Sequence, residues 1–279
     1  MRRYSYHRYY HNHRRISLFC ISFLLALTVM MSTRSLFSSS SKSKGIGGAA
    51  MALSTSTTTT VPKQYRILCF GDSLTAGTTF ESYQEYPYAP HLEKALKENN
   101  MATTSTSTSL DIMVRHKGYP GWTADQLLES ASGPGGLRSI IQNVQNPSLS
   151  LVVLLAGTND LGYMRSPQEI VESLIGLHKL CLQDEGIPNT IAIGIPSSAY
   201  QSINDDAKTA AHTTNELLKT WCENESNGKS TYFPFPFDFE RNSEKLWSSD
   251  GLHFSPKGYE ILGQSLVPLI QKLIVDSQQ

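Results

Sequence analysis

The stretch that decides the fold reads Ile67-Leu68-Cys69-Phe70-Gly71-Asp72-Ser73-Leu74-Thr75. A short apolar run stops at Gly71, and a serine follows two residues later. This pattern predicts a buried β-strand that ends in a loop carrying Ser73. In open α/β sheets, ligand sites gather at the carboxyl ends of the strands. Gly, Asp and Ser are also common turn residues, so taken alone Ser73 is either a turn residue or a nucleophile.

Charge is distributed unevenly along the 279 residues, although the formal net charge of the whole chain is zero. Residues 1–64 contain nine Lys and Arg and no Asp or Glu, so residues 65–279 carry 15 basic against 24 acidic side chains. The acidity of this second part argues against nucleic-acid binding, which needs a basic face. Its length is sufficient for a single domain with a sizeable core.

The four cysteines are Cys20, Cys69, Cys181 and Cys222. The three that follow the N-terminal segment are odd in number and far apart, so they form neither a disulfide framework nor a zinc-binding spacing. We expect buried free thiols. One disulfide remains an alternative if the domain is secreted.

The first 64 residues are expected to lie outside the folded domain. Residues 1–15 are basic and residues 16–31 are uncharged and almost wholly apolar, a layout that predicts a targeting signal with membrane association. As a helix this run would be about 24 Å long, short of the ~30 Å core of a bilayer. A cleaved signal peptide, a signal-anchor in the secretory pathway and an organelle signal therefore all stay open. Residues 32–64 are rich in Ser and Thr, which predicts a disordered linker.

From residue 65 to residue 279, predicted strands alternate with predicted helices. We expect strands at 65–70, 110–114, 149–155, 190–195 and 232–237, a surface loop at 99–109, and helices that include 86–98, 166–183, 205–222 and 256–274. The first, third and fourth strands are continuous apolar runs, which is typical of parallel strands covered by helices on both faces. The sequence therefore predicts a three-layer α/β/α domain with a parallel sheet of about five strands.

Four polar clusters follow predicted strands or lie near the carboxyl end of the chain. They are Gly71–Leu74, Gly118–Trp122, Gly157–Asp160 and Asp250–His253. Acyl transfer near neutral pH needs an activated nucleophile, a base held by a third group, and donors for the developing oxyanion. Together the four clusters contain residues of each required type.

Ser73 is the candidate nucleophile, and His253 is the candidate general base and acid. Asp250 lies three residues before His253, and Gly251 permits the tight turn that would let the carboxylate orient the imidazole. We expect Ser73 Oγ within about 3 Å of a His253 ring nitrogen. Asp250 and His253 could instead bind a metal or cap a helix, but no second His or carboxylate cluster accompanies them.

The candidate oxyanion donors follow the other two strands. Asn159 would donate from its side chain and Gly121 from its backbone N–H, although both residue types also serve simply to shape turns. Trp122 is a candidate wall of a substrate pocket, with a core position as the alternative. Asp72 is expected to shape the loop around Ser73 and not to react.

In this order and spacing, the four clusters resemble the SGNH (GDSL) hydrolase superfamily over about residues 65–275. The resemblance implies a flavodoxin-like three-layer fold and a serine esterase or lipase-like hydrolase that needs no metal or cofactor. It implies Ser73, Asp250 and His253 as the triad and Ser73, Gly121 and Asn159 as the oxyanion donors. Gly118 competes with Gly121 for the second donor, and Gly121 fits the family pattern better.

The expected function is hydrolysis of small-molecule carboxylic esters through an acyl-enzyme. By analogy with compact members of the superfamily we expect short acyl groups, such as those of O-acetylated sugars or small lipid esters. An acyltransferase, a lysophospholipase or thioesterase, and a non-catalytic binding module are the alternatives. Asn224-Glu225-Ser226 is a glycosylation sequon that matters only if the domain enters the secretory pathway.

Overall fold

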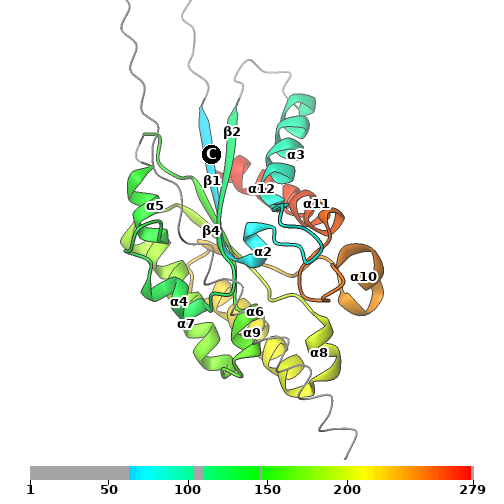
Figure 1. The fold of residues 1–279 in the computed structure, drawn as a ribbon. Helices are drawn as coiled ribbons and strands as arrows, with labels where there is room; N and C mark the ends of the chain where they lie inside the picture. The colour runs from blue at the N-terminus through cyan, green and yellow to red at the C-terminus, as the bar shows by residue number, and fades with distance from the viewer. Residues whose placement is uncertain (1–62, 104–109, 145, 278–279) are drawn as a thin grey trace, which may run out of the picture. The chain divides into compact units, whose positions relative to one another are not determined.

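Five parallel strands form the centre of the computed structural model, which describes residues 63–103, 110–144 and 146–277 (Figure 1). The strands are β1 (Gln64–Asp72), β2 (Asp111–Tyr119), β3 (Leu151–Leu155), β4 (Asn189–Ile193) and β5 (Ser230–Phe233). Their order across the sheet is β2-β1-β3-β4-β5, which is the flavodoxin-like order. The predicted parallel α/β fold is confirmed.

Helices cover both faces of the sheet (Figure 1). One face carries α4 (Ala124–Glu129), α5 (Leu137–Asn143), α7 (Pro167–Lys179) with the π-helical turn η1 (Leu180–Asp184), and α9 (Asp205–Asn224). The other carries α3 (Tyr88–Thr103), α11 (Pro256–Ser265) and α12 (Val267–Asp276). The short helices α2 (Ser73–Ala76), α6 (Thr158–Gly162) and α8 (Ala199–Ile203) follow β1, β3 and β4, and α10 (Phe239–Leu246) precedes α11.

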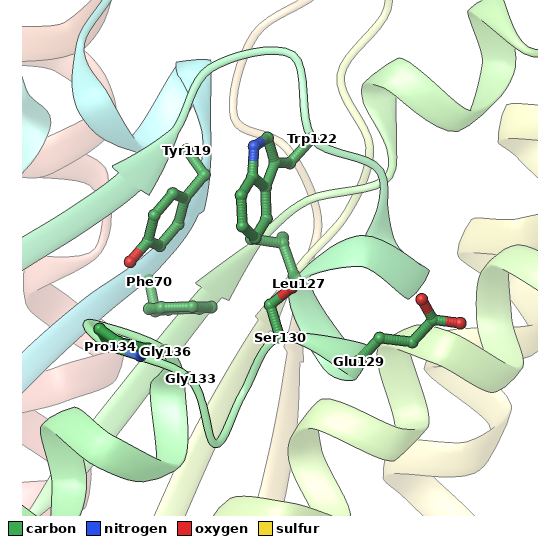
Figure 2. A pocket seen from close by; sticks show the side chains of 9 residues that line it. All are labelled: Phe70, Tyr119, Trp122, Leu127, Glu129, Ser130, Gly133, Pro134 and Gly136. Atoms are coloured by element: carbon green, nitrogen blue, oxygen red, sulfur yellow. The ribbon is translucent and has the colours of Figure 1, made fainter. Parts of the chain in front are cut away.

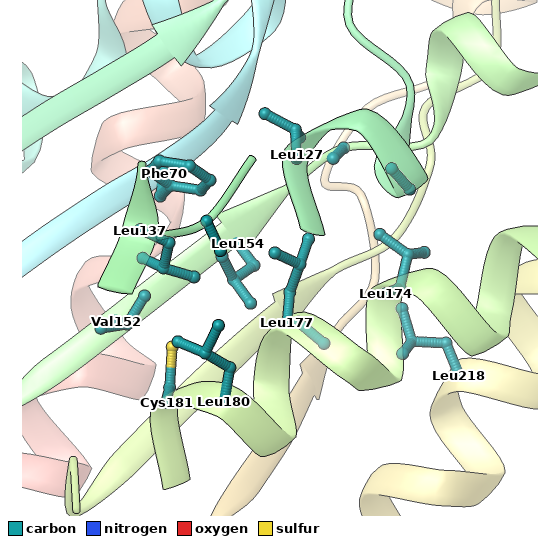
Figure 3. Packing of buried hydrophobic residues seen from close by; sticks show 14 of the residues in the cluster. Phe70, Leu127, Leu137, Val152, Leu154, Leu174, Leu177, Leu180, Cys181 and Leu218 are labelled. Atoms are coloured by element: carbon teal, nitrogen blue, oxygen red, sulfur yellow. The ribbon is translucent and has the colours of Figure 1, made fainter. Parts of the chain in front are cut away.

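Alternating side chains of the strands divide the core into two apolar clusters, because successive strand residues point to opposite faces of the sheet. Leu68 and Phe70 of β1 pack toward α4, α7 and α9, whereas Ile67 and Cys69 pack toward α3, α11 and α12. Figure 3 shows Phe70 and the β3 residue Leu154 in the first cluster, beside leucines of the covering helices. The expected free thiols are confirmed for the described cysteines, all of which are buried.

Two predicted boundaries are wrong at the β2 edge of the sheet. The strand predicted at 110–114 runs on to Tyr119, because Cys69–Asp72 of β1 pair with residues 116–119. Its polar residues obscure the pattern since an edge strand is partly exposed. The loop predicted at 99–109 is helical as far as Thr103, where α3 ends.

Prolines account for the differences near the carboxyl end. The strand predicted at 232–237 is β5 at residues 230–233 and ends before Pro234, since proline cannot donate to a strand ladder. The helix predicted at 256–274 is two helices, α11 and α12, and Pro268 lies in the first turn of α12. A proline is tolerated there because the first N–H groups of a helix lack intrahelical partners.

Both N-terminal predictions, the targeting run at 16–31 and most of the linker at 32–64, lie outside the described residues. Strand β1 already begins at Gln64. Within the part of the chain that the structure describes, no helix is long and apolar enough to span a bilayer. The targeting signal and the location of the protein stay predictions.

Gly71 of β1 lies against the backbone of β3, with no room for a side chain. A Cβ atom at Gly71 would lie 1.8 Å from the carbonyl oxygen of Leu155, whereas one at Gly162 would meet nothing within 4 Å among the described residues. We therefore expect Gly71→Ala to lower the melting temperature by about 5 °C or more, or to prevent folding, because backbone atoms cannot yield as a side chain does. Gly162→Ala is the control. Equal melting temperatures for the two variants would contradict this packing.

Candidate active site

The register of the sheet brings three loops together at its carboxyl edge. Asp72 of β1 pairs with Tyr119 of β2, and Gly71 pairs with Leu155 of β3. Neighbouring strands lie about 4.8 Å apart, so the residues that follow these pairs leave the sheet side by side. They include Ser73, Gly121 and Asn159. This edge between β1 and β3 is also the topological switch point, where flavodoxin-like sheets bind ligands.

Ser73 is the first residue of α2, directly after β1. The Asp72 side chain caps this helix by accepting a hydrogen bond from the N–H of Leu74 at 2.9 Å. Asp72 thus shapes the loop, as predicted from the sequence. Ser73 is 4 % exposed, so its hydroxyl lies in a largely dry environment where hydrogen bonds and charges act strongly.

His253 lies beside Ser73 although it is 180 residues further along the chain. Its Nε2 lies 3.0 Å from Ser73 Oγ, close to the distance expected from the sequence. Its Nδ1 lies 2.7 Å from Asp250 Oδ2. A serine hydroxyl facing an imidazole whose far nitrogen faces a carboxylate is the arrangement that nucleophilic catalysis requires.

A tight turn holds Asp250 and His253 in this geometry. Gly251 has φ +64°, and Asp250 Oδ1 accepts the N–H groups of Leu252 and His253 at 3.0 Å each. Burial raises the pKa of Asp250, but the hydrogen bond and charge of His253, together with these N–H groups, outweigh burial and hold the pKa below its usual range. Asp250 is therefore ionised at neutral pH and keeps a proton on the facing nitrogen of His253.

The two glycines that compete for the role of oxyanion donor have different surroundings. A Cβ atom at Gly118 would lie 2.4 Å from the carbonyl oxygen of Asp72, so Gly118 is required for packing of β2 against α2. Gly121 has φ +81° and lies in the loop after β2, where a Cβ atom would meet no described atom within 4 Å. Packing therefore accounts for glycine at position 118 and the positive φ accounts for glycine at position 121, and the donor role of Gly121 stays a prediction.

Asn159 and Asp160 bind neighbouring points of the loop that carries Gly121. The Asn159 amide donates to the carbonyl oxygen of Trp122 at 2.8 Å, and Asp160 Oδ2 accepts the N–H of Ala124 at 2.9 Å. These two bonds fix α6 against the start of α4. They hold the Asn159 side chain close to the loop that carries Gly121.

In the sequence, Asp160 has no signal beyond its place in the Gly157–Asp160 cluster. It is fully buried, and burial raises its pKa to about 6 against the lowering effects of the Ala124 N–H and the Arg165 charge. Arg165 Nε lies 3.8 Å from Asp160 Oδ1, and Arg165 also pairs with Asp125 of α4. A buried aspartate needs such partners. Arg165 gave no sequence signal because it is one of many charged loop residues.

Trp122 lines a pocket of about 300 Å³ beside this loop, together with Phe70, Tyr119, Leu127, Glu129, Ser130, Gly133, Pro134 and Gly136. Figure 2 shows the Trp122 and Tyr119 rings side by side above Phe70, with the Glu129 carboxylate pointing away from them. The two rings stack with centroids 4.5 Å apart. Trp122 is thus a partly exposed wall residue that also packs on the core.

No group of three or more His, Cys, Asp and Glu side chains is arranged to hold a metal within the described ranges.

Burial of the Asp72 carboxylate lowers the free energy of unfolding near neutral pH. Burial raises its pKa to about 7 from 3.8, Asp160 raises it further, and the Leu74 N–H opposes both. The folded state therefore binds the Asp72 proton more tightly than the unfolded state, and stability falls as pH rises from about 4 to about 7. We expect the melting temperature of Asp72→Asn to match the wild type near pH 4 and to exceed it by several degrees near pH 8.

The control for this measurement is Asp238→Asn, which changes the exposed aspartate that caps α10. Its difference from the wild type should depend less on pH because water screens an exposed charge. A wild type that is more stable than Asp72→Asn at pH 8 would contradict the electrostatic account.

Comparison with known proteins gives a family for the chain. A family model described as the GDSL-like Lipase/Acylhydrolase family matches residues 69–261, which is more than half of the chain. No curated protein matches the chain.

Several solved structures share the fold. An acetyl esterase mutant solved with an acetate ion matches with TM-score 0.55 and 18% identity, covering 76% of this chain and 99% of that one. A carbohydrate esterase family 3 structure from Talaromyces cellulolyticus matches with TM-score 0.54 and 18% identity, with the same coverage of 76% and 99%. A carbohydrate acetylesterase family member from Sinorhizobium meliloti gives TM-score 0.51 and 17% identity, covering 75% and 98%.

At such low identity the structural likeness shows the fold alone, and the family match supports the activity. The chain belongs to the GDSL-like lipase/acylhydrolase family and is a carboxylic ester hydrolase.

Proposed function

We propose that the protein hydrolyses small carboxylic esters through an acyl-enzyme on Ser73, with His253 and Asp250 completing a catalytic triad. The observation that supports this most is the pair of hydrogen bonds from Ser73 to His253 at 3.0 Å and from His253 to Asp250 at 2.7 Å. Ser73 and His253 are both buried, so the reaction proceeds away from bulk water.

In the first step, His253 Nε2 takes the Ser73 proton as Oγ forms a bond to the ester carbonyl carbon. The carbonyl π electrons move to oxygen, and the resulting oxyanion accepts hydrogen bonds from the Ser73 and Gly121 N–H groups and the Asn159 amide. Asp250 stabilises the imidazolium that forms. The carbonyl then reforms as the bond to the alcohol oxygen breaks, and His253 gives its proton to the departing alcohol.

In the second step, water replaces the alcohol. His253 takes a proton from the water as its oxygen bonds to the acyl carbon, and the Ser73 Oγ bond then breaks with return of the proton to Ser73. The products are a carboxylic acid and the unchanged enzyme. If a sugar or lipid hydroxyl replaced water, the same intermediate would give acyl transfer, so products formed with an added alcohol distinguish hydrolase from acyltransferase.

Short acyl groups are our proposal for the first substrates to test, with O-acetylated sugars as the leading class. The similar solved structures include an acetyl esterase and carbohydrate esterases, although the likeness supports only the fold. Lysophospholipids and thioesters belong in the same panel because fold and triad do not fix the leaving group. The pocket beside Trp122 is the candidate for holding the part of the substrate that does not react.

Removal of the nucleophile is the primary test. Ser73→Ala should abolish hydrolysis of p-nitrophenyl acetate, because neither step of the mechanism is possible without Oγ. The melting temperature should stay within a few degrees of the wild type. A folded Ser73→Ala protein with full activity would overturn the proposal.

Asp160 should act on the reaction through Asn159. We expect Asp160→Ala to lower kcat/KM about tenfold to a hundredfold, mainly in kcat, because the oxyanion donors lose their fixed positions. Asp160→Asn should recover most of this loss, since its amide oxygen still accepts the Ala124 N–H. Asp184→Ala, which removes an exposed carboxylate paired with Arg138, is the control.

A double-mutant cycle separates this positioning role from a general loss of structure. In an Asn159→Ala background the further loss caused by Asp160→Ala should be much smaller, because the donor that it positions is already absent. Fully additive losses would contradict the assignment.

A further inference from the structure

The turn that carries Asp250 and His253 is not positioned by the sheet. The nucleophile and the candidate oxyanion donors follow strands whose register sets where they lie, whereas residues 248–254 lie between α10 and α11. We call residues 248–254 the triad turn. Contacts with neighbouring segments therefore set the distance between the triad turn and Ser73.

Ser248 binds the two ends of the triad turn together. Its N–H donates to the carbonyl oxygen of His253 at 2.8 Å, and its hydroxyl donates to the carbonyl oxygen of Phe254 at 3.1 Å. The carbonyl oxygen of Ser248 accepts the N–H of Gly251 at 3.0 Å. The turn is thus closed on itself, so a contact that fixes Ser248 or its neighbour Ser249 also fixes the imidazole.

The segment between α2 and α3 supplies such a contact. Glu81 Oε1 accepts the N–H of Ser249 at 2.6 Å, although 168 residues separate the two along the chain. One residue earlier, the Phe80 N–H donates to the Ser248 hydroxyl at 3.4 Å. This segment directly follows the helix that begins with Ser73. These bonds therefore join the stretch that carries the nucleophile to the stretch that carries the base.

A second loop holds the triad turn from the side of β4. The Ala199 N–H donates to the carbonyl oxygen of Gly251 at 2.9 Å, at the start of α8. That bond joins two backbone groups, so it remains when side chains are changed. The bond to Ser249 instead depends on the Glu81 carboxylate, and a single substitution removes it.

The Glu81 carboxylate is ionised when it binds Ser249. The hydrogen bond from the Ser249 N–H, helped by the Ser248 and Ser249 hydroxyl groups, lowers the pKa of Glu81 to about 2 against the raising effect of partial burial. Hydrogen bonds to an ionised acceptor are shorter and stronger than those between neutral groups. Although the Glu81 side chain is exposed, it can therefore hold the turn.

We infer that Glu81 is a positioning residue, whose carboxylate holds the triad turn at the distance from Ser73 that proton transfer to His253 needs. The inference rests on the proposed function, since it assigns a role within that reaction. Glu81 acts through Ser249 and the closed turn, and not on the reacting atoms. A misplacement of about 1 Å can lower a rate about a hundredfold, so loss of this bond should lower kcat more than it changes KM.

The test compares Glu81→Ala, Glu81→Gln and Glu85→Ala in the full chain, with p-nitrophenyl acetate as substrate. Glu85 is the matched control because it is exposed on the same segment, while its charge acts on His116 of β2. We expect Glu81→Ala to lower kcat about tenfold or more, with KM within about twofold of the wild type. Glu81→Gln should recover most of this loss, because its amide oxygen still accepts the Ser249 N–H. The control should match the wild type.

Melting temperatures of these variants should stay within a few degrees of the wild type, because both glutamates are exposed. An unchanged kcat in Glu81→Ala would overturn the inference, and so would equal losses in Glu81→Ala and Glu81→Gln. A Glu81→Asp variant with full activity, beside a Glu81→Gln variant without it, would assign the effect to the charge and also contradict the positioning role.

A double-mutant cycle shows whether Glu81 acts through His253. The measured quantity is the rate at which a fluorophosphonate labels Ser73. Glu81→Ala should lower this rate about tenfold in the native background and by less than about twofold in the His253→Ala background, where the base that it positions is already absent. Equal losses in the two backgrounds would refute the inference. Full activity of Ser73→Ala would refute the proposed function itself, so the two failures are distinguishable.

Discussion

The parallel register of β1 with its two neighbours is the constraint on which the rest of the site depends. Gly71 pairs with Leu155 and Asp72 pairs with Tyr119, so three loops leave the sheet at one edge. A shift of one residue in either pair would turn every strand side chain to the other face and remove the alignment of Ser73, Gly121 and Asn159. Since both faces of β1 are packed against helices, such a shift would also expose the core.

Two buried carboxylates accompany this arrangement. Asp72 caps the helix that begins with Ser73, and Asp160 fixes the loop that carries Gly121. Both carboxyls have raised pKa values because they are buried. The fold thus retains groups that reduce its stability near neutral pH in order to fix backbone positions around the nucleophile. That exchange of stability for a fixed geometry is typical of active sites, where dipoles must be in place before charge develops.

The sequence predicts best those features whose pattern has a single structural explanation. The apolar runs of β1, β3 and β4 predict the parallel sheet, because strands with both faces covered leave no polar positions. The four clusters predict the distance between Ser73 and His253, although 180 residues separate them. The family pattern favours Gly121 over Gly118 as the oxyanion donor, whereas the close packing of Gly118 against Asp72 has no signal in the sequence.

Other features could not be predicted because they arise from contacts between distant segments. The second half of β2 is polar and follows its pairing with β1, not its own pattern. The hydrogen bond from the Ala124 N–H to Asp160 joins α4 to α6, which no local signal in the sequence connects.

The central claim is that Ser73 is the nucleophile and that His253 activates it. Labelling the native full chain with a fluorophosphonate and identifying the modified peptide by mass tests both parts at once. The account predicts a single adduct on Ser73 and a large fall in labelling rate for the His253→Ala variant. An adduct on a different residue, or ester hydrolysis that persists while Ser73 stays unlabelled, would contradict it.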